Sequence, residues 1–232
     1  MRSAAKEKAR AAWVQIGDAA RLELHHTPWW RHIQRDYRRY EVTGDPALRT
    51  IFLSQGFWAS CVYRLSRAAL YGARPRFLRV LLQPFVAIAQ KAVEIVTGIC
   101  IPVECAIGEG LYIGHFGTIV LATQGRMGHN CSVAQNVSVG VAGTGRERGW
   151  PTIGNRVFIG AHSVLAGKIT IGDDAMICAG SVVTRSVPAR AVVIGNPARV
   201  ISYEGSFDYV LYDGMDVDPA RRASLEKTTA QL

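Results

Sequence analysis

The amino-acid sequence predicts an α+β protein, in which an N-terminal helical region of residues 1–98 is followed by a solenoid of short strands over residues 99–203. Two observations predict this division. Apolar residues follow a helical spacing up to Gly98, and from Ile101 onward aliphatic residues recur every six positions. Residues 204–232 lack the repeat, and their DPARRASLEK predicts a short capped helix or a mobile tail.

Composition limits the class of protein. The chain has 232 residues, of which 49% are hydrophobic, so it can bury a sizeable core. Its five cysteines show no CxxC spacing, which argues against a disulfide framework or a zinc knuckle and fits a reducing cytoplasm. The charged, alanine-rich N-terminus is unlike a signal peptide. Residues 80–89 are interrupted by Gln83 and Pro84 and are shorter than the ~20 apolar residues of a spanning helix, so no transmembrane segment is expected.

Positive charge is concentrated at the start of the chain. The net charge is +9, and residues 1–95 hold 16 Lys and Arg against 7 Asp and Glu. Such a segment could approach anionic lipid, a phosphorylated substrate or nucleic acid, although a solvated helical surface explains it more simply. The run WWRHIQRDYRRY shows no repeated groove pattern, and no nucleic-acid partner is expected. We expect a cytoplasmic protein with at most a peripheral contact to the inner face of the cytoplasmic membrane.

The helical region divides at its glycines and prolines. Residues 4–25 and 28–41 are expected to be helical. Asp45 followed by Pro46 is typical of an N-cap and first helical position, and the helix that starts there is expected to end at Gly72. A further helix is expected from Pro75 to about Gly98, with a kink at Pro84.

The six-residue period is the strongest pattern in the sequence. It is typical of hexapeptide solenoids, in which three units form one triangular coil and aliphatic side chains stack into a continuous core. An eight-residue step from Ile119 to Met127 predicts a small bulge, and residues 140–152 form a polar insertion expected to project from one face, commonly the binding face. The repeated positions are Ile101, Ile107, Ile113, Ile119, Met127, Val133 and Val139, then Ile153, Ile159, Leu165, Ile171, Ile177 and Val183.

These motifs resemble a known superfamily. The stretches IGEGLYIGHFGTIV and PTIGNRVFIGAHSVLAGKITIGDDAMICAGSVVTRSVP look like those of the left-handed parallel β-helix acyltransferases. Within that superfamily the chain is similar to the serine acetyltransferase branch, which also includes O-acetyltransferases of exopolysaccharide biosynthesis. The resemblance implies a left-handed solenoid, acetyl-CoA as co-substrate, and a homotrimer with active sites between neighbouring solenoids. In serine acetyltransferases the helical regions pair such trimers into hexamers.

The resemblance also implies roles for particular residues. His115 matches the general base, which removes a proton from an acceptor hydroxyl as it attacks a thioester; such assistance contributes about 10² to 10⁴ in rate. Gly114 and Gly117 would leave room for the acceptor and the thioester carbonyl. The positions matched to acetyl-CoA binding are Gly140, Gly160, Ala161, Ala179 and Gly180 for the pantetheine arm and Arg185 and Arg199 for the phosphates.

Two positions depart from the serine-specific pattern. Cys100 stands where those enzymes place the carboxylate that orients the histidine, and either Glu104 or a backbone carbonyl could substitute. Gly149 and Trp150 stand where an Arg-His pair binds serine. Trp150 could stack on a sugar ring or pack at a trimer interface. Separations of 14 and 33 between His115, His129 and His162 do not match the metal-binding set of γ-class carbonic anhydrases, so no metal is expected.

Three hypotheses follow. The departures favour an acetyl-CoA-dependent O-acetyltransferase that acts on a saccharide hydroxyl of an exopolysaccharide precursor. A second hypothesis keeps serine as the acceptor and places the enzyme in cysteine biosynthesis. A third is a non-catalytic solenoid that scaffolds partners through its basic helices.

Overall fold

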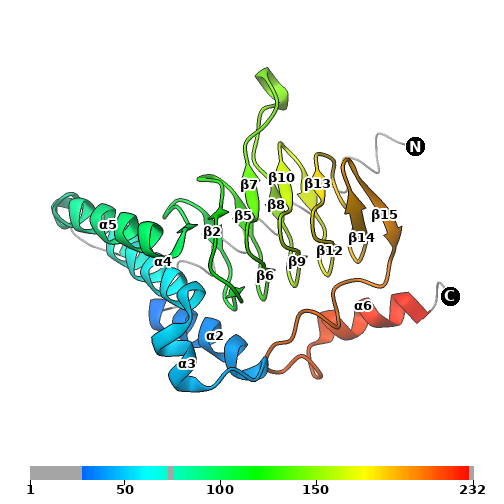
Figure 1. Cartoon of the computed structure of the whole chain (residues 1–232), viewed down its shortest axis with the longest axis horizontal. Coiled ribbons are helices and arrows are strands. Elements are labelled where there is room, and N and C mark those ends of the chain that lie inside the picture. Colours follow the sequence, from blue (N-terminus) through cyan, green and yellow to red (C-terminus); the bar gives the residue numbers. More distant parts are fainter. Residues whose placement is uncertain (1–27, 73–75, 230–232) are drawn as a thin grey trace.

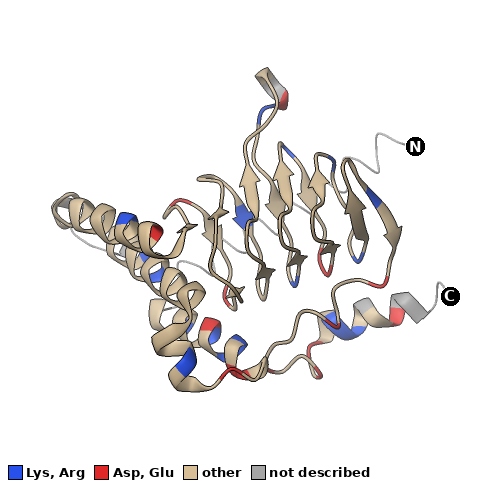
Figure 2. Ribbon diagram, in the orientation of Figure 1, with Lys and Arg blue, Asp and Glu red and all other residues tan. Residues whose placement is uncertain are grey.

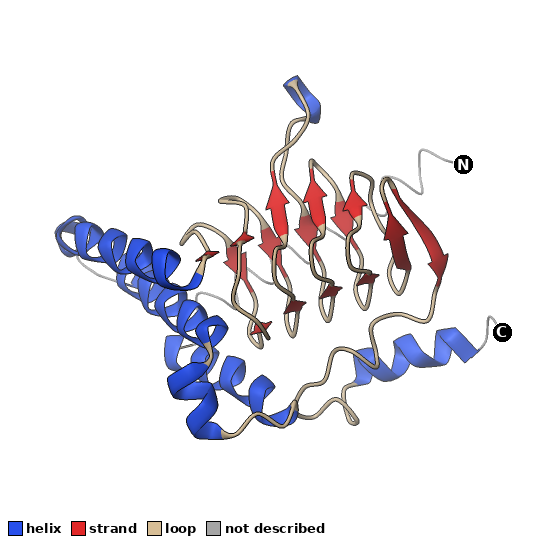
Figure 3. Ribbon diagram, in the orientation of Figure 1, coloured by secondary structure: helices blue, strands red, loops and turns tan. Residues whose placement is uncertain are grey.

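A computed structural model describes residues 28–72 and 76–229 of the chain. Helices gather at one end, and a coil of short strands extends away from them (Figure 1). Colouring by secondary structure separates the two parts, and further helical segments lie at the tip of a projecting loop and near the C-terminus (Figure 3). This arrangement confirms the predicted α+β class. The helix expected over residues 4–25 lies outside the described residues.

The helical region contains four described helices: α2 (Trp29–Val42), α3 (Ala47–Leu53), α4 (Gln55–Gly72) and α5 (Arg76–Thr97). The single helix expected from Asp45 to Gly72 is wrong, because Ser54 adopts an extended backbone with φ −85° and ψ 100° between α3 and α4. The Ser54 hydroxyl accepts a hydrogen bond from the Phe57 N–H at 3.4 Å and so helps to start α4. Asp45 does not cap α3; it pairs with Arg49 at 3.5 Å instead.

Helix α5 has an apolar outward side. It packs against α4 and runs through Pro84 without ending there. Residues Phe77–Thr97 are long and apolar enough to cross a membrane, by length and composition only, with a mean hydropathy of 1.4 and 6% of the stretch buried. The expectation that Gln83 and Pro84 break this segment is therefore wrong. Its exposed apolar residues are Phe77, Val80, Leu81, Phe85, Ile88, Ile95 and Val96.

The strands form the three faces of a left-handed β-helix. Each face is a sheet in which strands from successive coils pair in parallel. The first sheet contains β1 (Ile99–Cys100), β4 (Ile119–Val120), β7 (Ser138–Gly140), β10 (Val164–Ala166) and β13 (Val182–Val183). The second contains β2 (Ala106–Ile107), β5 (Arg126–Met127), β8 (Thr152–Ile153) and β11 (Thr170–Ile171). The third contains β3 (Tyr112–Ile113), β6 (Ser132–Val133), β9 (Phe158–Ile159), β12 (Met176–Ile177), β14 (Val192–Gly195) and β15 (Ala198–Ser202).

The solenoid core follows the predicted repeat. Every repeated aliphatic position from Ile101 to Val183 is buried. At the eight-residue step the longer turn buries Leu121 and Ala122, whereas Thr123 is exposed. The insertion forms a narrow arm that projects from the solenoid between β7 and β8 and carries the short helix η1 (Gly145–Glu147) (Figure 1).

Buried polar side chains join the helices to the first coil. Arg64 pairs with Asp36 at 2.9 Å and donates to the Ile107 and Gly108 carbonyls at 2.7 and 2.6 Å. Asp36 accepts the Leu111 N–H at 2.8 Å, and the Tyr40 hydroxyl donates to the Ile113 carbonyl at 3.0 Å. These contacts satisfy backbone groups at an edge of the coil that would otherwise stay unpaired. We call Asp36, Arg39, Tyr40, Tyr63 and Arg64 the polar junction.

The C-terminal segment packs back along the solenoid. Strand β15 is antiparallel to β14, and the tail that follows buries Phe207 and Val210 before α6 (Pro219–Thr229) begins. The Asp218 carboxylate accepts the Ala220 N–H at 2.8 Å and caps α6, which confirms the capped-helix alternative. Asp213 pairs with Arg38 of α2 at 2.9 Å, so the tail also reaches the helical region.

Candidate active site

His115 lies on the turn that joins β3 to β4 in the first coil. Gly114, His115 and Phe116 are exposed, and Phe116 keeps 66% of its surface accessible. Gly117 has φ +131°, a value that L side chains rarely adopt. A Cβ at Gly114 would lie 3.2 Å from the Tyr112 ring, so the turn holds its small residues close to β3. The turn thus presents an accessible imidazole from a fixed backbone.

The same corner of the triangle repeats in the next coils. Gly117, Asn136, His162 and Gly180 each lie two residues before a strand of the first sheet, and the last three have φ values of 58°, 60° and 71°. His162 N–H donates to the Gln135 carbonyl at 3.0 Å, and Gly180 N–H donates to the Ala161 carbonyl at 2.8 Å. We call these four positions, each with the residue before it, the corner column. His115 lies at its first-coil end, two residues before Gly117.

Most of the small residues expected to bind acetyl-CoA fall in this column. Gly160, Ala161, Ala179 and Gly180 stack in adjacent coils, and a Cβ at Gly160 would lie 2.6 Å from the Ala179 nitrogen. Gly180 has no heavy atom within 4 Å of its ideal Cβ position, so its outer side is open. Gly140 lies instead on β7, in the first sheet, and also borders open space. The small residues of the column leave the solenoid backbone accessible, which suits an extended ligand chain that lies against it.

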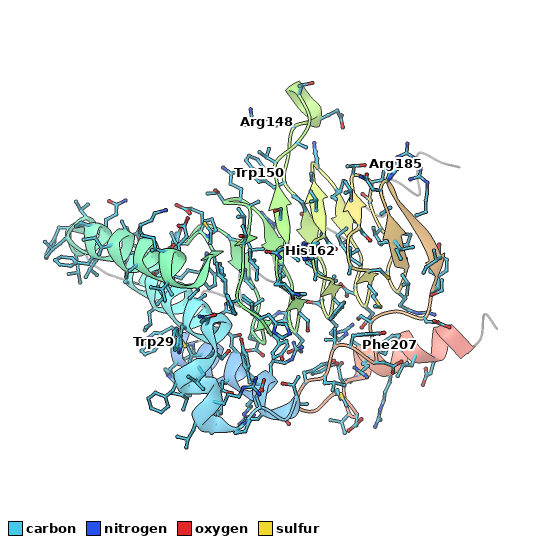
Figure 4. The ribbon with its side chains drawn as sticks, in the orientation of Figure 1. Trp29, Arg148, Trp150, His162, Arg185 and Phe207 are labelled. Atoms are coloured by element: carbon cyan, nitrogen blue, oxygen red, sulfur yellow. The ribbon has the colours of Figure 1, made fainter. Side chains whose placement is uncertain are left out.

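The two arginines expected at the phosphates share one site. Arg185 and Arg199 line a small pocket between β13 and β15, together with Thr184 and Ser186. Arg185 lies at the end of the solenoid far from the helices (Figure 4). A pocket with two guanidinium groups and two hydroxyls can bind a phosphate through charge-assisted hydrogen bonds.

Trp150 lies at the base of the arm. It is partly buried and packs against the aliphatic core of its own solenoid (Figure 4). Gly149 pairs with Ala142 across the arm, and a Cβ at Gly149 would lie 2.8 Å from the Lys168 Cβ. The indole therefore anchors the arm to the coil. The trimer-interface interpretation of Trp150 stays a prediction.

The two candidate partners of His115 have different positions. Cys100 lies on β1, in register with Val120 of β4, directly after the His115 turn. Burial, and then the nearby Glu94 charge, raise the pKa of the Cys100 thiol, so it stays protonated. Glu104 is exposed on the turn between β1 and β2, a different corner from the one that carries His115. Sequence reasoning missed Glu94, which lies in the last turn of α5 and lines one small pocket with Cys100.

Two other histidines lie near the site or the junction. His162 contacts Asn136 at 3.3 Å between the Nε2 and Nδ2 atoms, within the corner column. His129 lies on a turn of the second coil, close enough to influence buried His32 of α2. In the part of the chain that the structure describes, no three His, Cys, Asp or Glu side chains form a group that could hold a metal ion.

Comparisons with known proteins point to one family. Residues 151–185 match the model of the bacterial transferase hexapeptide family, described as six repeats. Serine acetyltransferase of Mycobacterium tuberculosis is 32% identical over 184 residues, which cover 77% of each chain. Serine acetyltransferase of Synechococcus elongatus is 34% identical over 141 residues, 60% of this chain and 53% of the relative, so the chain spans about half of that protein.

Solved structures agree with the sequence relatives. The Neisseria gonorrhoeae serine acetyltransferase in complex with serine matches with a TM-score of 0.64 and 27% identity, over 81% of this chain and 74% of that one. A serine acetyltransferase in complex with CoA matches with a TM-score of 0.61 and 26% identity, over 74% and 68%. Because these matches are serine acetyltransferases, the expected saccharide acceptor of exopolysaccharide biosynthesis is wrong, and the non-catalytic scaffold also loses its support.

Proposed function

The chain belongs to the serine acetyltransferase family of hexapeptide-repeat transferases, and we propose that it transfers the acetyl group of acetyl-CoA to the hydroxyl of serine. The observation that carries this proposal is the match to the Mycobacterium tuberculosis enzyme, which covers 77% of both chains and spans helices and solenoid alike. The product would be an activated serine ester for cysteine synthesis. The departures at Gly149 and Trp150 then mean that the serine carboxylate and ammonium are held by other groups than the Arg-His pair.

His115 performs the proton transfer in this mechanism. Its imidazole takes the proton from the serine hydroxyl as the oxygen attacks the thioester carbonyl of acetyl-CoA. Backbone N–H groups stabilise the tetrahedral oxyanion. When the intermediate collapses, the C–S bond breaks and the imidazolium returns the proton to the departing thiolate of CoA. The exposed turn suits this role, because both substrates must reach the same imidazole.

Acetyl-CoA lies along the corner column in this proposal. The thioester end reaches His115, the pantetheine arm follows the small residues from Ala161 to Gly180, and the phosphates reach the pocket of Arg185 and Arg199. Replacing both arginines by alanine is expected to raise the KM for acetyl-CoA about tenfold or more, because charge-assisted hydrogen bonds to phosphate are lost. The KM for serine is expected to stay unchanged in the same kinetic assay.

The functional assembly is a homotrimer in this proposal. The outward side of α5 supports self-association, since a contiguous apolar face of this length is rarely left to water. Phe85, which is 65% exposed, lies in the middle of that face. Phe85→Glu is expected to lower the mass measured by sedimentation equilibrium, whereas Arg49→Glu on α3, outside the face, is expected to leave it unchanged.

We place the enzyme in the cytoplasm, with a peripheral contact to anionic membrane through its basic helices. Lys and Arg residues occur on several of the helices (Figure 2). Sedimentation with vesicles that contain anionic lipid should be seen at low salt and lost as salt is raised. Sedimentation that is absent at low salt, or that salt leaves unchanged, would contradict this contact.

The acceptor is tested by measuring CoA release from acetyl-CoA with serine and with saccharides side by side. Serine is expected to support release and mono- or oligosaccharides are not. A protein that binds acetyl-CoA but releases no CoA in the presence of serine would overturn the proposed function.

A further inference from the structure

The segment around the catalytic turn contains three carboxylates, Glu94, Glu104 and Glu109. Glu104 lies on the turn between β1 and β2. Glu109 lies on the turn between β2 and β3, where it faces Arg35 at 3.8 Å. Glu94 belongs to the last turn of α5, which leads directly into β1. Only this last position shares a corner with the turn that carries His115.

The His115 turn stacks directly on the end of α5. Gly117 N–H donates to the Thr97 carbonyl at 3.3 Å, and Ile119 N–H donates to the Gly98 carbonyl at 3.0 Å. A Cβ at Gly98 would lie 3.2 Å from the Gly117 carbonyl carbon, so the two backbones touch. The last residues of α5 and the residues around His115 are therefore neighbours in successive layers of one corner.

Glu94 lies between two side chains. The Lys91 ammonium donates to the Glu94 Oε2 atom at 2.7 Å, and Cys100 lines the same small pocket as Glu94 at the junction of α5 and β1. Cys100 is on the strand of β1 that lies in register with Val120, five residues after His115. The Glu94 side chain is 35% exposed. A carboxylate has about four lone-pair positions, so these two neighbours leave room for a further donor.

A general-base histidine needs negative charge beside it. When the imidazole takes a proton it becomes a cation, and a carboxylate close to the ring fixes its orientation and stabilises that cation. The C-terminal end of a helix carries about half a negative charge and acts in the same sense. The end of α5 thus brings a carboxylate and a helix dipole to the corner where the imidazolium forms.

From this arrangement we propose that Glu94 is the positioning residue of His115, and that it supplies from α5 the negative charge that Cys100 cannot supply from β1. The inference rests on the proposed function, because it requires His115 to act as the base. It gives the helical region a part in catalysis. Glu94 belongs to the helical region, and it precedes the strand that carries Cys100 because α5 leads directly into β1.

The first test is Glu94→Gln. We expect kcat to fall about 10- to 100-fold, as for other groups that orient a reacting side chain, with the KM for acetyl-CoA unchanged. The acid limb of the kcat/KM profile should also move to lower pH, because the imidazolium loses its negative neighbour. A residue that only supports the fold would lower activity without moving that limb. Thermal unfolding of the variant reports whether it is folded.

The second test moves the carboxylate. The double variant Glu94→Gln with Cys100→Asp places a carboxylate on β1, and we expect it to recover most of the activity and the original acid limb. Glu104→Gln, a carboxylate of the same coil at another corner, is the matched control and is expected to stay within about twofold of the wild type.

The outcomes separate this inference from the proposed function. If His115→Ala loses acetyl transfer while Glu94→Gln keeps it, the positioning role is wrong and the proposed base stands. If Glu94→Gln loses activity with an unmoved acid limb and no recovery by Cys100→Asp, Glu94 is structural and the inference fails. If His115→Ala keeps acetyl transfer, the proposed function fails first.

Discussion

The polar junction and the solenoid stack are held together by opposite means. The stack buries aliphatic side chains at every repeat, so each coil contributes a similar share of hydrophobic stabilisation. The junction buries charged and hydroxyl groups, and its stability depends on a few hydrogen bonds to the edge of one coil. The stack therefore tolerates local change, whereas the junction does not. The coil that carries His115 lies at the junction, so the site depends on the less tolerant of the two regions.

The largest effect is expected at the buried ion pair of the junction. Arg64→Ala would leave Asp36, which is fully buried, without its cation, and would free the Ile107 and Gly108 carbonyls. Breaking such a pair costs about 3–5 kcal/mol of the free energy of unfolding, measured by urea titration. Arg49→Ala breaks the exposed pair with Asp45 and should cost at most about 1 kcal/mol. Equal losses of unfolding free energy in the two variants would show that the buried pair is no more important to stability than the exposed one.

The second effect is a pH dependence that comes from His32, a buried residue of α2 that is influenced by Arg64 and Asp36 of the junction. Burial first, and then the charge of Arg64, lower the pKa of His32 from 6.5 to about 4; His129 and Arg67 act in the same direction and Asp36 opposes them. Neither ring nitrogen has a hydrogen-bond partner among the described residues, so the ring is buried neutral. Because the unfolded state binds the proton more readily, this contribution is complete above pH 6.5 and is lost as the pH falls through 4.

The loss should amount to at most about 3 kcal/mol at pH 4, measured as the free energy of unfolding against pH. In His32→Leu the same series should be flatter between pH 4 and 6.5. A variant as steep as the wild type would show that other groups cause the acid sensitivity.

The smallest effect is expected in the stack. Ile159→Val removes one methylene from a fully buried position of β9 and should cost about 1 kcal/mol in the same titration. Ile177→Val, in register on β12, should cost a similar amount, because both side chains have the same surroundings in successive coils. A cost several times larger at one position than at the other would contradict the view of the stack as equivalent layers.

The same contrast explains how much the sequence could predict. The stack was predictable residue by residue, since a six-residue period leaves one arrangement for its aliphatic positions, and it places His115, Ala161 and Gly180 on turns. The break between α3 and α4 could not be predicted, because it depends on the extended backbone and the hydroxyl of one residue, Ser54. The junction and Glu94 depend on how a helix docks on a coil, which no periodicity encodes. The contact of Trp150 with the core depends on how the arm folds back to the coil, which the six-residue period does not encode.

The proposed mechanism depends most directly on His115 as the general base. The decisive measurement is kcat/KM for serine in His115→Ala, with acetyl-CoA binding followed by calorimetry in the same preparation. We predict that kcat/KM for serine falls by about 10² to 10⁴, with acetyl-CoA affinity and thermal stability unchanged. Acetyl transfer to serine within a few-fold of the wild type would contradict it.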